Sequence, residues 1–506
     1  MQQVLLNPKR MLIPLLALLL LLLASCQPAA PATDTADSGE AAPSEIVVLT
    51  RTEPDTLDPH QTQSRYASLV LNAMFDPPIW TDANQEFQPG LFTSWELSED
   101  QLTWTFTIRE GVTFHDGEAV NAEAVKYNFD RIVDPEIKSV GAGIIIGPYV
   151  GSEVIDAYTV QVNFSEPYGA FLNALASPAV WFGLVSPAAA EEMGTDFNLS
   201  PVGTGPFMFE EYVPQEMISL VRNPDYAWGP DFFENQGAAK SERIVFRFVG
   251  EETTRLAALE AGEADVVIEI PPLEVQRLVD SGEFNVISAP VPGMPVAALI
   301  NASKPPLDDL LVRQALNFAT DQESIVNTLY DGQWTAAQST LAPNTWGYDE
   351  EAASLYSYDP EQANALLDEA GWIDSDGDGI REKDGEPLEV LYLALYGPPY
   401  DPGEVLQAQL AAVGITMNYQ VLEGAQHRAA SRRGDHDLSW TRWVSVDPLV
   451  LDTYFNSENI GTGFNYSHVP DPEMDELLAA GRAETDLEKR KEIYVKTSFS
   501  IKSLWI

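Results

Sequence analysis

The chain has 506 residues and a formal net charge of −49, with 28 Lys and Arg against 77 Asp and Glu. The length corresponds to roughly two to four domain-sized units, and 45% hydrophobic residues can build real cores, which excludes disorder as the overall state. Because affinity for nucleic-acid phosphates comes from Lys and Arg, we expect no nucleic-acid partner. One cysteine cannot form a disulfide scaffold. The acidic excess predicts a strongly solvated surface, with a preference for cationic cargo as the alternative.

The N-terminus is typical of a lipoprotein signal. Residues 1–25 combine a short basic start with the apolar run 11–24, which is shorter than the about 20 residues that a membrane-spanning helix needs. Small residues precede Cys26 as in a bacterial lipobox, in which this cysteine takes a lipid and becomes the mature N-terminus. The alternative for Cys26 is a buried free thiol. Residues 26–44 are rich in Pro, Ala, Ser and Thr and predict a flexible tether.

Hydrophobic periodicity predicts the elements of the first half. Alternating apolar residues over 102–108 are typical of a half-buried strand, and Gly111 then predicts a hairpin turn into Val112 and Phe114. Short apolar runs predict further strands, and the segment 252–261 predicts a helix. The other strands of this half are expected over 45–50, 244–249 and 265–270.

The second half alternates helices and strands. An amphipathic helix is expected over 308–320. After it come a helix over 360–370, a strand over 388–395, a helix over 402–413 and a strand over 415–421. A strand, a helix and a strand in this order predict two parallel strands joined by a right-handed crossover. The fold class is therefore α/β, with more than one lobe.

Catalytic motifs are missing, so we expect no enzyme. The chain has no nucleophile elbow, zinc-protease motif, P-loop or dinucleotide-binding glycine pattern. No histidine has a partner at metal-ligand spacing, and for His115 and Asp116 we favour a hydrogen-bonded structural pair over an acid–base couple. Residues 203–205 favour a turn over a phosphate cradle. The histidines are His60, His115, His427, His436 and His468.

One acidic loop has calcium-ligand spacing. Asp374, Asp376 and Asp378 occupy positions 1, 3 and 5, a glycine follows at position 6, and Glu382 lies at position 9. Position 12 is Gly385, where a bidentate Glu would normally close the site. The alternatives are a structural calcium site and a Gly/Asp-rich loop with solvated acids. We expect no cofactor apart from that calcium.

Four segments resemble the solute-binding proteins of ABC importers, family 5, the peptide- and nickel-binding group. They follow in order, with family-like spacing, over about residues 56–494. The segments are SWELSEDQLTWTFTIREGVTFHDG (94–117), PVGTGPF (201–207), TRLAALEAGEAD (254–265) and LDDLLVRQALNFATDQESI (307–325).

The resemblance implies a two-lobed clamshell like the periplasmic binding proteins, with solute held between the lobes. It implies that the protein is extracytoplasmic, held to the cell membrane through its lipid, and a monomer that delivers solute to a permease and its ATPase subunits. The implied parts are lobe I at 45–79 and 203–288, an extra subdomain of lobe I at 80–202, lobe II at 289–480, and a return toward lobe I at 481–506.

The chain departs from the family pattern at the segment Ser439–Pro448. Peptide binders of the family place here an aspartate that pairs with the peptide's α-amino group, and the matching residue is Val444, which carries no charge. Asp447 either substitutes for it or caps the next helix, and Arg442 offers a fork for a carboxylate or a phosphate. The residues expected to line the cleft are Tyr66, Trp346, Arg442, Trp443 and Asp447, with interlobe or core contacts as the alternative for the last three.

A second departure concerns the C-terminus. Family members continue past a helix at 487–494 through an apolar strand and a helix that return to lobe I, whereas here residues 495–506 end the chain. We expect a truncated reading frame.

The favoured function is capture of an oligopeptide or peptide-like solute for an ABC importer. The alternatives are a secreted hydrolase acting on peptides or glycans, and a ligand sensor with the same fold.

Overall fold

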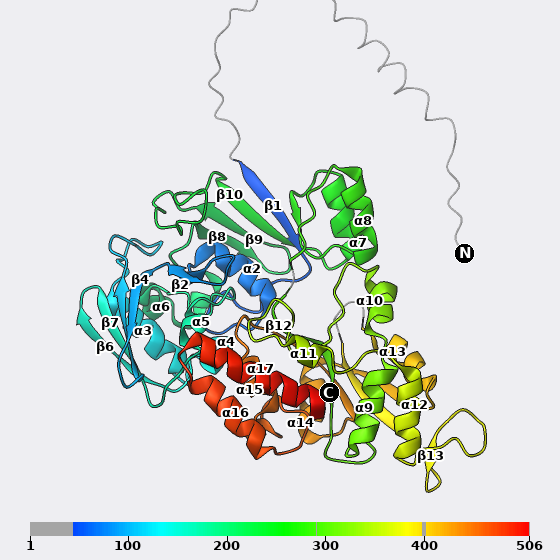
Figure 1. Cartoon of the computed structure of the whole chain (residues 1–506). Helices are drawn as coiled ribbons and strands as arrows, with labels where there is room; N and C mark the ends of the chain where they lie inside the picture. The colour runs from blue at the N-terminus through cyan, green and yellow to red at the C-terminus, as the bar shows by residue number, and fades with distance from the viewer. Residues whose placement is uncertain (1–43, 290, 397–400, 505–506) are drawn as a thin grey trace, which may run out of the picture. The chain divides into compact units, whose positions relative to one another are not determined.

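The computed structural model describes residues 44–289, 291–396 and 401–504. The segments 1–25 and 26–44, apart from Ser44, lie outside these residues, and so does Cys26. The described part has three larger sheets, each with its own hydrophobic core (Figure 1). Together they form the two lobes and the extra subdomain.

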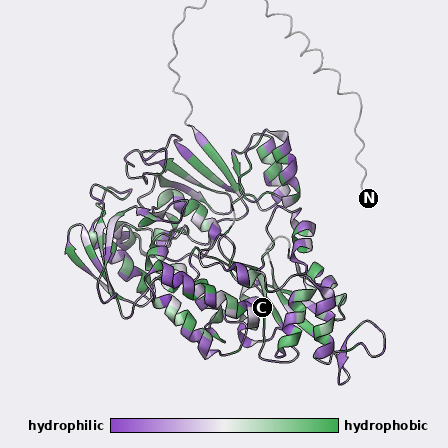
Figure 2. Cartoon of the chain, viewed as in Figure 1, coloured by the Kyte–Doolittle hydropathy of each residue, from purple (hydrophilic) through white to green (hydrophobic). Residues whose placement is uncertain are grey.

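The lobe I sheet has the strand order β11-β1-β10-β9-β8. Parallel pairs join β1 to β10 and to β11, whereas β10, β9 and β8 pair antiparallel. Alternate residues such as Val48, Ile218 and Phe246 pack in a core with helix α2. Figure 2 shows the hydrophobic character of these strands. The bounds are β1 (Glu45–Thr50), α2 (Arg65–Met74), β8 (Phe207–Val213), β9 (Met217–Arg222), β10 (Arg243–Phe248), α7 (Glu252–Glu260), β11 (Val266–Val267) and α8 (Pro272–Ser281).

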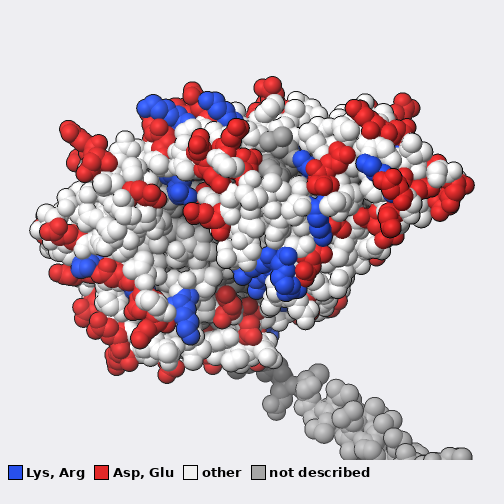
Figure 3. All heavy atoms as spheres, turned by 90° about the horizontal axis from the view of Figure 1, so that it is seen from below, with Lys and Arg blue, Asp and Glu red and all other residues white. Residues whose placement is uncertain are grey.

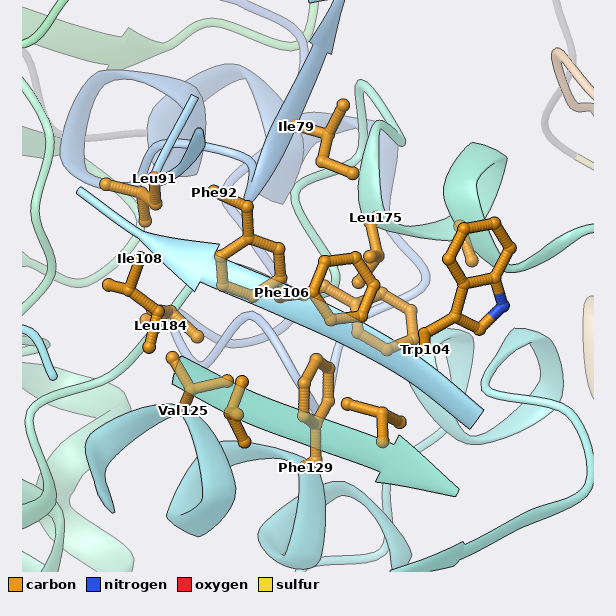
Figure 4. Packing of buried hydrophobic residues seen from close by; sticks show 14 of the residues in the cluster. Ile79, Leu91, Phe92, Trp104, Phe106, Ile108, Val125, Phe129, Leu175 and Leu184 are labelled. Atoms are coloured by element: carbon orange, nitrogen blue, oxygen red, sulfur yellow. The ribbon is translucent and has the colours of Figure 1, made fainter. Parts of the chain in front are cut away.

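The extra subdomain is built on the antiparallel sheet β4-β5-β7-β6. Figure 4 shows Phe92, Phe106 and Phe129 converging from β4, β5 and α3, and the rings of Phe92 and Phe106 are 4.7 Å apart. The bounds are β2 (Ile79–Thr81), β3 (Phe87–Pro89), β4 (Phe92–Leu97), β5 (Thr103–Ile108), α3 (Ala122–Val133), α4 (Gly141–Ile145), β6 (Tyr149–Asp156), β7 (Thr159–Phe164), α5 (Phe171–Leu175), α6 (Pro187–Met193) and η2 (Gly194–Leu199).

The hairpin expected after Gly111 is wrong. Strand β5 is confirmed, but its partners are β4 and β7. Val112 and Phe114 are buried in the core without forming a strand, and the turn makes only the isolated bridge between Thr113 and Ala119.

The lobe II sheet has the strand order β12-β17-β15-β16. Strands β15 and β16 are parallel and α13 connects them, which confirms the predicted crossover unit. One face of the sheet packs against α9, α12 and α13, and the other against α15, α16 and α17. The bounds are β12 (Gly293–Ile300), α9 (Leu310–Ala319), α10 (Gln322–Tyr330), α11 (Glu350–Ala353), α12 (Pro360–Glu369), β13 (Glu382–Lys383), β14 (Glu386–Pro387), β15 (Glu389–Leu395), α13 (Gly403–Ala411), β16 (Thr416–Leu422), α14 (Gly424–Arg433), β17 (Leu438–Val444), α15 (Val450–Phe455), η3 (Ser457–Asn459), α16 (Pro472–Ala483) and α17 (Leu487–Leu504).

Two of the predicted helices, α9 and α12, begin where the sequence supplies a side-chain cap. Asp309 and Asp359 accept backbone N–H groups at the starts of α9 and α12. The helix expected over 487–494 continues to Leu504 as α17, which packs against α11 and α16 and is described here with lobe II. Within the described residues, no helix is both long enough and apolar enough to span a membrane.

Candidate functional site

Arg442 lies at the carboxyl end of β17, beside the lobe II sheet edge where ligands of open α/β sheets bind. Side chains alternate along a strand, so Arg442 shares its face with Leu438 and Trp440, which pack in the core beneath α9 and α13. Strand β15 runs parallel to β17 and ends at Leu395. The strand directions therefore place Arg442 at the rim of the sheet, beyond the core.

The Arg442 guanidinium is half-buried and lacks a partner. Within the described part of the chain it makes no hydrogen bond and no ion pair. Burial lowers the pKa of Arg442, and the neighbouring cation Arg65 of lobe I lowers it further. An arginine in this state is poised to bind an anion, since an anion offsets both the burial and the repulsion.

Tyr330 and Trp334 form an aromatic platform beside Arg442. Tyr330 ends helix α10, and the left-handed backbone of Asp331 turns the chain so that Trp334 returns over the tyrosine. The two rings are parallel within 9° and their centroids are 3.9 Å apart. Trp334 remains 45% exposed, so one face of its ring is free for a flat or apolar group.

Asp401 supplies the acidic group of this region. Its Oδ1 accepts the backbone N–H of Gly403 at 2.7 Å, at the start of α13. Burial raises the pKa of Asp401, and hydrogen bonds from the Gly403 N–H and the Tyr419 hydroxyl oppose this rise only in part. Tyr330 interacts electrostatically with both Asp401 and Arg442, so opposite charges flank this ring.

Lobe I contributes a wall built on Tyr66 and Glu269. The Tyr66 hydroxyl donates to Glu269 Oε2 at 3.1 Å and accepts from Arg65 Nη2 at 2.9 Å. Arg65 also forms an ion pair with Glu269. The side chain of Ser64 caps α2 and thereby fixes the first turn that carries Arg65 and Tyr66.

The buried Arg255 of α7 anchors this wall. Its guanidinium donates to the backbone carbonyls of Val249 (2.7 Å), Gly250 (3.0 Å) and Glu269 (3.1 Å). Glu269 has a left-handed backbone, which is costly for a residue with a side chain and is held here by the anchor. The segment 254–265 that resembles the family therefore supports the wall built on Tyr66 and Glu269.

The two walls face each other. Helix α10 of lobe II lies beside α8 of lobe I (Figure 1). Arg65 of lobe I also interacts electrostatically with Arg442 of lobe II. Figure 3 shows a face with many acidic side chains and a small gathering of Lys and Arg near its middle.

A second arginine, Arg490 of α17, forms a buried cluster behind the lobe II sheet. Its Nη1 and Nη2 donate to the two carboxylate oxygens of Asp447 at 2.6 and 2.8 Å. The guanidinium lies 5.0 Å from the ring centre of Trp346 and 5.2 Å from that of Tyr494. Asn173 of the extra subdomain donates to the same carboxylate at 2.7 Å. Burial lowers the pKa of Arg490, but the charges of Asp447 and Tyr494 and the hydrogen bonds to them together outweigh burial, so the pKa rises.

The structure brings Tyr66 and Arg442 into the same region and places the other predicted lining residues elsewhere. Asp447 and Trp346 both contact Arg490. Trp443 follows Arg442 and therefore points to the opposite face of β17, where its ring lies 5.5 Å from that of Phe464. Asp447 and Trp443 therefore follow the alternative of interlobe or core contacts, and Trp346 joins the Arg490 cluster. Val444 ends β17 with 47% of its surface exposed and introduces no charge.

Sequence reasoning missed most of the site. Arg65 and Trp334 carry no motif of their own, and Tyr330, Asp401 and Glu269 are far apart along the chain. A usable signal was the sheet rule, because residues just after the carboxyl ends of parallel strands gather at one edge. That rule would have selected Asp401, which follows β15 and precedes α13.

His115 and Asp116 are not bonded to each other. His115 Nε2 bonds to the carbonyl of Gly205 at 3.0 Å, and Asp116 accepts from Ser186 at 2.5 Å. Residues 203–205 form a bent loop that packs closely on the end of α2, where a Cβ at Gly203 would lie 2.2 Å from the carbonyl oxygen of Met74.

The acidic loop is exposed and partly satisfied by its own backbone. One ligand oxygen from each of Asp374, Asp376 and Asp378 lies within 4.8 Å of the others. Asp374 already accepts the N–H groups of Gly377 and Gly379 at 2.6 and 3.0 Å. Glu382 instead accepts a hydrogen bond from Ser375. A calcium ion at this loop stays a prediction.

Comparisons with known proteins agree with this architecture. The model of bacterial extracellular solute-binding proteins, family 5, matches residues 86–464. The dipeptide-binding protein of Escherichia coli is 30% identical over 81% of this chain and 78% of its own length. The glutathione-binding protein GsiB of Salmonella typhi is 28% identical over 92% and 88%.

A solved structure shows the same fold. The crystal structure of NikA from Brucella suis in complex with Fe(III)-EDTA superimposes with a TM-score of 0.79 and 26% identity, covering 91% of this chain and 92% of that one. The family match spans well over half of the chain, as the resemblance of the four segments predicts. The chain therefore belongs to the bacterial extracellular solute-binding proteins of family 5.

Proposed function

We propose that this protein captures a peptide or peptide-like solute between its lobes and delivers it to the permease of an ABC importer. The observation that carries the proposal is the site at the lobe II sheet edge, where Arg442 and the Trp334 platform face Arg65 and Tyr66 of lobe I. Aromatic walls with few polar groups are typical of small-molecule sites.

The relatives support the solute class. The names of two of them state that they bind a dipeptide and glutathione, both peptides. In the proposed cycle, hinge closure presents the loaded form to the permease, and a separate subunit hydrolyses ATP. The protein itself performs no covalent chemistry, and a lipid on Cys26 holds it at the outer face of the cell membrane.

Native mass spectrometry of the full-length chain tests the proposal. The co-purified solute is released and identified, and the empty protein is then offered a pool of short peptides. We expect masses spaced by amino-acid residues, because a binder with few fixed polar groups accepts several side chains. A single sugar or polyamine mass, with no peptide retained from the pool, would contradict the peptide assignment.

A further inference from the structure

We infer that the solute carries a carboxylate, and that Arg442 of lobe II binds it with the help of Arg65 from lobe I. The inference rests on the proposed function and narrows its substrate class. The negative end of the solute then binds two residues before Val444, the position at which the resemblance implies an acid for a peptide's amino group.

The first argument is charge balance at Arg442. A half-buried guanidinium has lost part of its hydration, and no described residue replaces it with a hydrogen bond or an ion pair. Buried Arg490 on the other face of the same sheet shows what this protein supplies when an arginine is structural, namely a bidentate carboxylate. Arg442 therefore lacks the carboxylate partner that Arg490 has. We expect the solute to provide that carboxylate.

The second argument is the neighbouring cation. Arg65 and Arg442 repel each other, and this repulsion contributes to the lowered pKa of Arg442. The nearby acid Glu269 is already shared between Arg65 and the Tyr66 hydroxyl. A carboxylate placed between the two lobes stabilises both guanidinium groups and favours the closed form.

The third argument is shape and polarity. The planar fork of Arg matches the two oxygens of a carboxylate, and the Trp334–Tyr330 platform beside it can hold the adjoining flat peptide group. Val444 lies on the same face of β17 as Arg442 and has no charge, so a free amino group finds no partner there. The unpaired charge on β17 itself is thus positive, and the acid of this region, Asp401, lies at the start of α13.

A competing explanation uses no solute anion. If the Glu269 carboxylate moved from Arg65 to Arg442 when the lobes closed, Arg442 would stabilise the closed form through an ion pair between the lobes and would not bind the solute. That explanation predicts that loss of Arg442 weakens acidic and neutral solutes equally. Carboxylate recognition predicts that loss of Arg442 weakens only the acids.

The experiment uses paired synthetic probes. Full-length wild-type protein is dialysed against a library of tripeptides, each present as the free acid and as the C-terminal amide, and of small carboxylic acids with their amides. Bound members are quantified by mass spectrometry. We expect wild type to prefer acids over amides by about 10- to 100-fold, the range of a hydrogen-bonded charge. Arg442→Gln should reduce this preference below about threefold, and Arg442→Lys should keep part of it.

The matched control is Arg433→Gln. Arg433 lies on α14 in the same lobe, is exposed, and pairs with Asp435 at 2.6 Å. This variant removes the same charge from the same lobe and should keep the wild-type preference. Equal retention of acids and amides by wild type would overturn the inference and leave solute capture intact. Equal weakening of both forms in Arg442→Gln would overturn it in favour of Glu269, and retention of no member would contradict the proposed function as well.

Discussion

Two arginines of lobe II, on opposite faces of one sheet, differ in every respect that matters for function. Arg490 has a side chain that is 0% exposed, binds both oxygens of Asp447, donates from Nε to the carbonyl of Gly481 at 2.7 Å, and lies close to two aromatic rings. Arg442 is half-buried, is repelled by Arg65, and has no partner among the described residues.

The difference separates structural charge from functional charge. Removing a charge from water is costly, so a protein that needs it only for packing also supplies its counter-charge. A half-buried charge without such a partner lowers the stability of the fold unless a bound ligand supplies the counter-charge. The same distinction explains why Asp447, although predicted to line the cleft, instead joins lobe II to the extra subdomain through Arg490 and Asn173.

The largest expected effect is on stability at Arg490. The change Arg490→Met leaves the Asp447 carboxylate buried and unpaired, so the free energy of unfolding should fall by about 3–5 kcal/mol, as measured by urea denaturation. Arg433→Gln, which breaks an exposed ion pair, should cost less than about 1 kcal/mol. Similar losses for the two variants would show that burial of the Arg490 cluster contributes nothing extra.

Lowering the pH should destabilise the protein through the buried side chain of His60. Burial, and then the neighbouring Arg131, lowers the pKa of His60 to about 4, and its Nδ1 is 2.7 Å from Arg131 Nη1. The unfolded chain takes up this proton near pH 6.5, so stability is full above that pH and falls as the pH drops toward 4, by about 3 kcal/mol. His60→Asn should flatten the dependence of the unfolding free energy on pH in this window.

Asp76 provides a control of opposite sign. Burial raises the pKa of Asp76 to about 6, although Tyr226, Trp228 and Thr204 donate hydrogen bonds to it. The folded state therefore binds this proton more readily between about pH 4 and 6, so its contribution to stability falls as the pH rises. Asp76→Asn should steepen the loss of stability on acidification. Identical pH profiles in His60→Asn and Asp76→Asn would contradict both assignments.

Trp443 and Trp334 provide the same comparison, between a structural and a functional side chain, without a charge. Trp443 packs between Tyr454 and Phe464, so Trp443→Ala should lower the unfolding free energy by about 3 kcal/mol. Trp334 is largely outside the core, so Trp334→Ala should leave stability within about 0.5 kcal/mol. It should instead weaken solute binding by about 2- to 10-fold in calorimetry, through the lost stacking face. If Trp334→Ala lowered the free energy of unfolding and left solute binding unchanged, Trp334 would be a structural residue and not a binding residue.

The smallest expected effect concerns calcium at the exposed loop. Asp374 already accepts two backbone N–H groups and position 12 is a glycine, so we expect calcium to shift the thermal midpoint by less than about 1 °C. A larger rise that Asp376→Asn abolishes would establish a structural calcium site.

The sequence predicted elements whose evidence is local. Strand alternation located β5 and β10, a short apolar run located β1, and helical patterns located α9 and α12. The partner of β5 could not be predicted, because the choice between the next segment and the distant β7 depends on the whole sheet. Strand β11 has two residues instead of the expected six, since only Val266 and Val267 reach β1.

The site was predictable only in part. Arg442 and Tyr66 were selected, but Trp443 and Arg442 were assigned to one cleft although neighbours on a strand point to opposite faces. Glu269, Tyr330 and Asp401 meet only because the crossover connections bring strand ends and helix ends together. Such convergence is a property of the topology, and no short motif encodes it.

The most direct test of this account is a crystal structure of the protein with its co-purified solute. We predict a solute carboxylate within about 3 Å of both terminal nitrogens of Arg442, with Arg65 on its other side and a planar solute group over Trp334. A neutral solute group at Arg442, or the Glu269 carboxylate in its place, would contradict the claim that Arg442 recognises a negatively charged group of the solute.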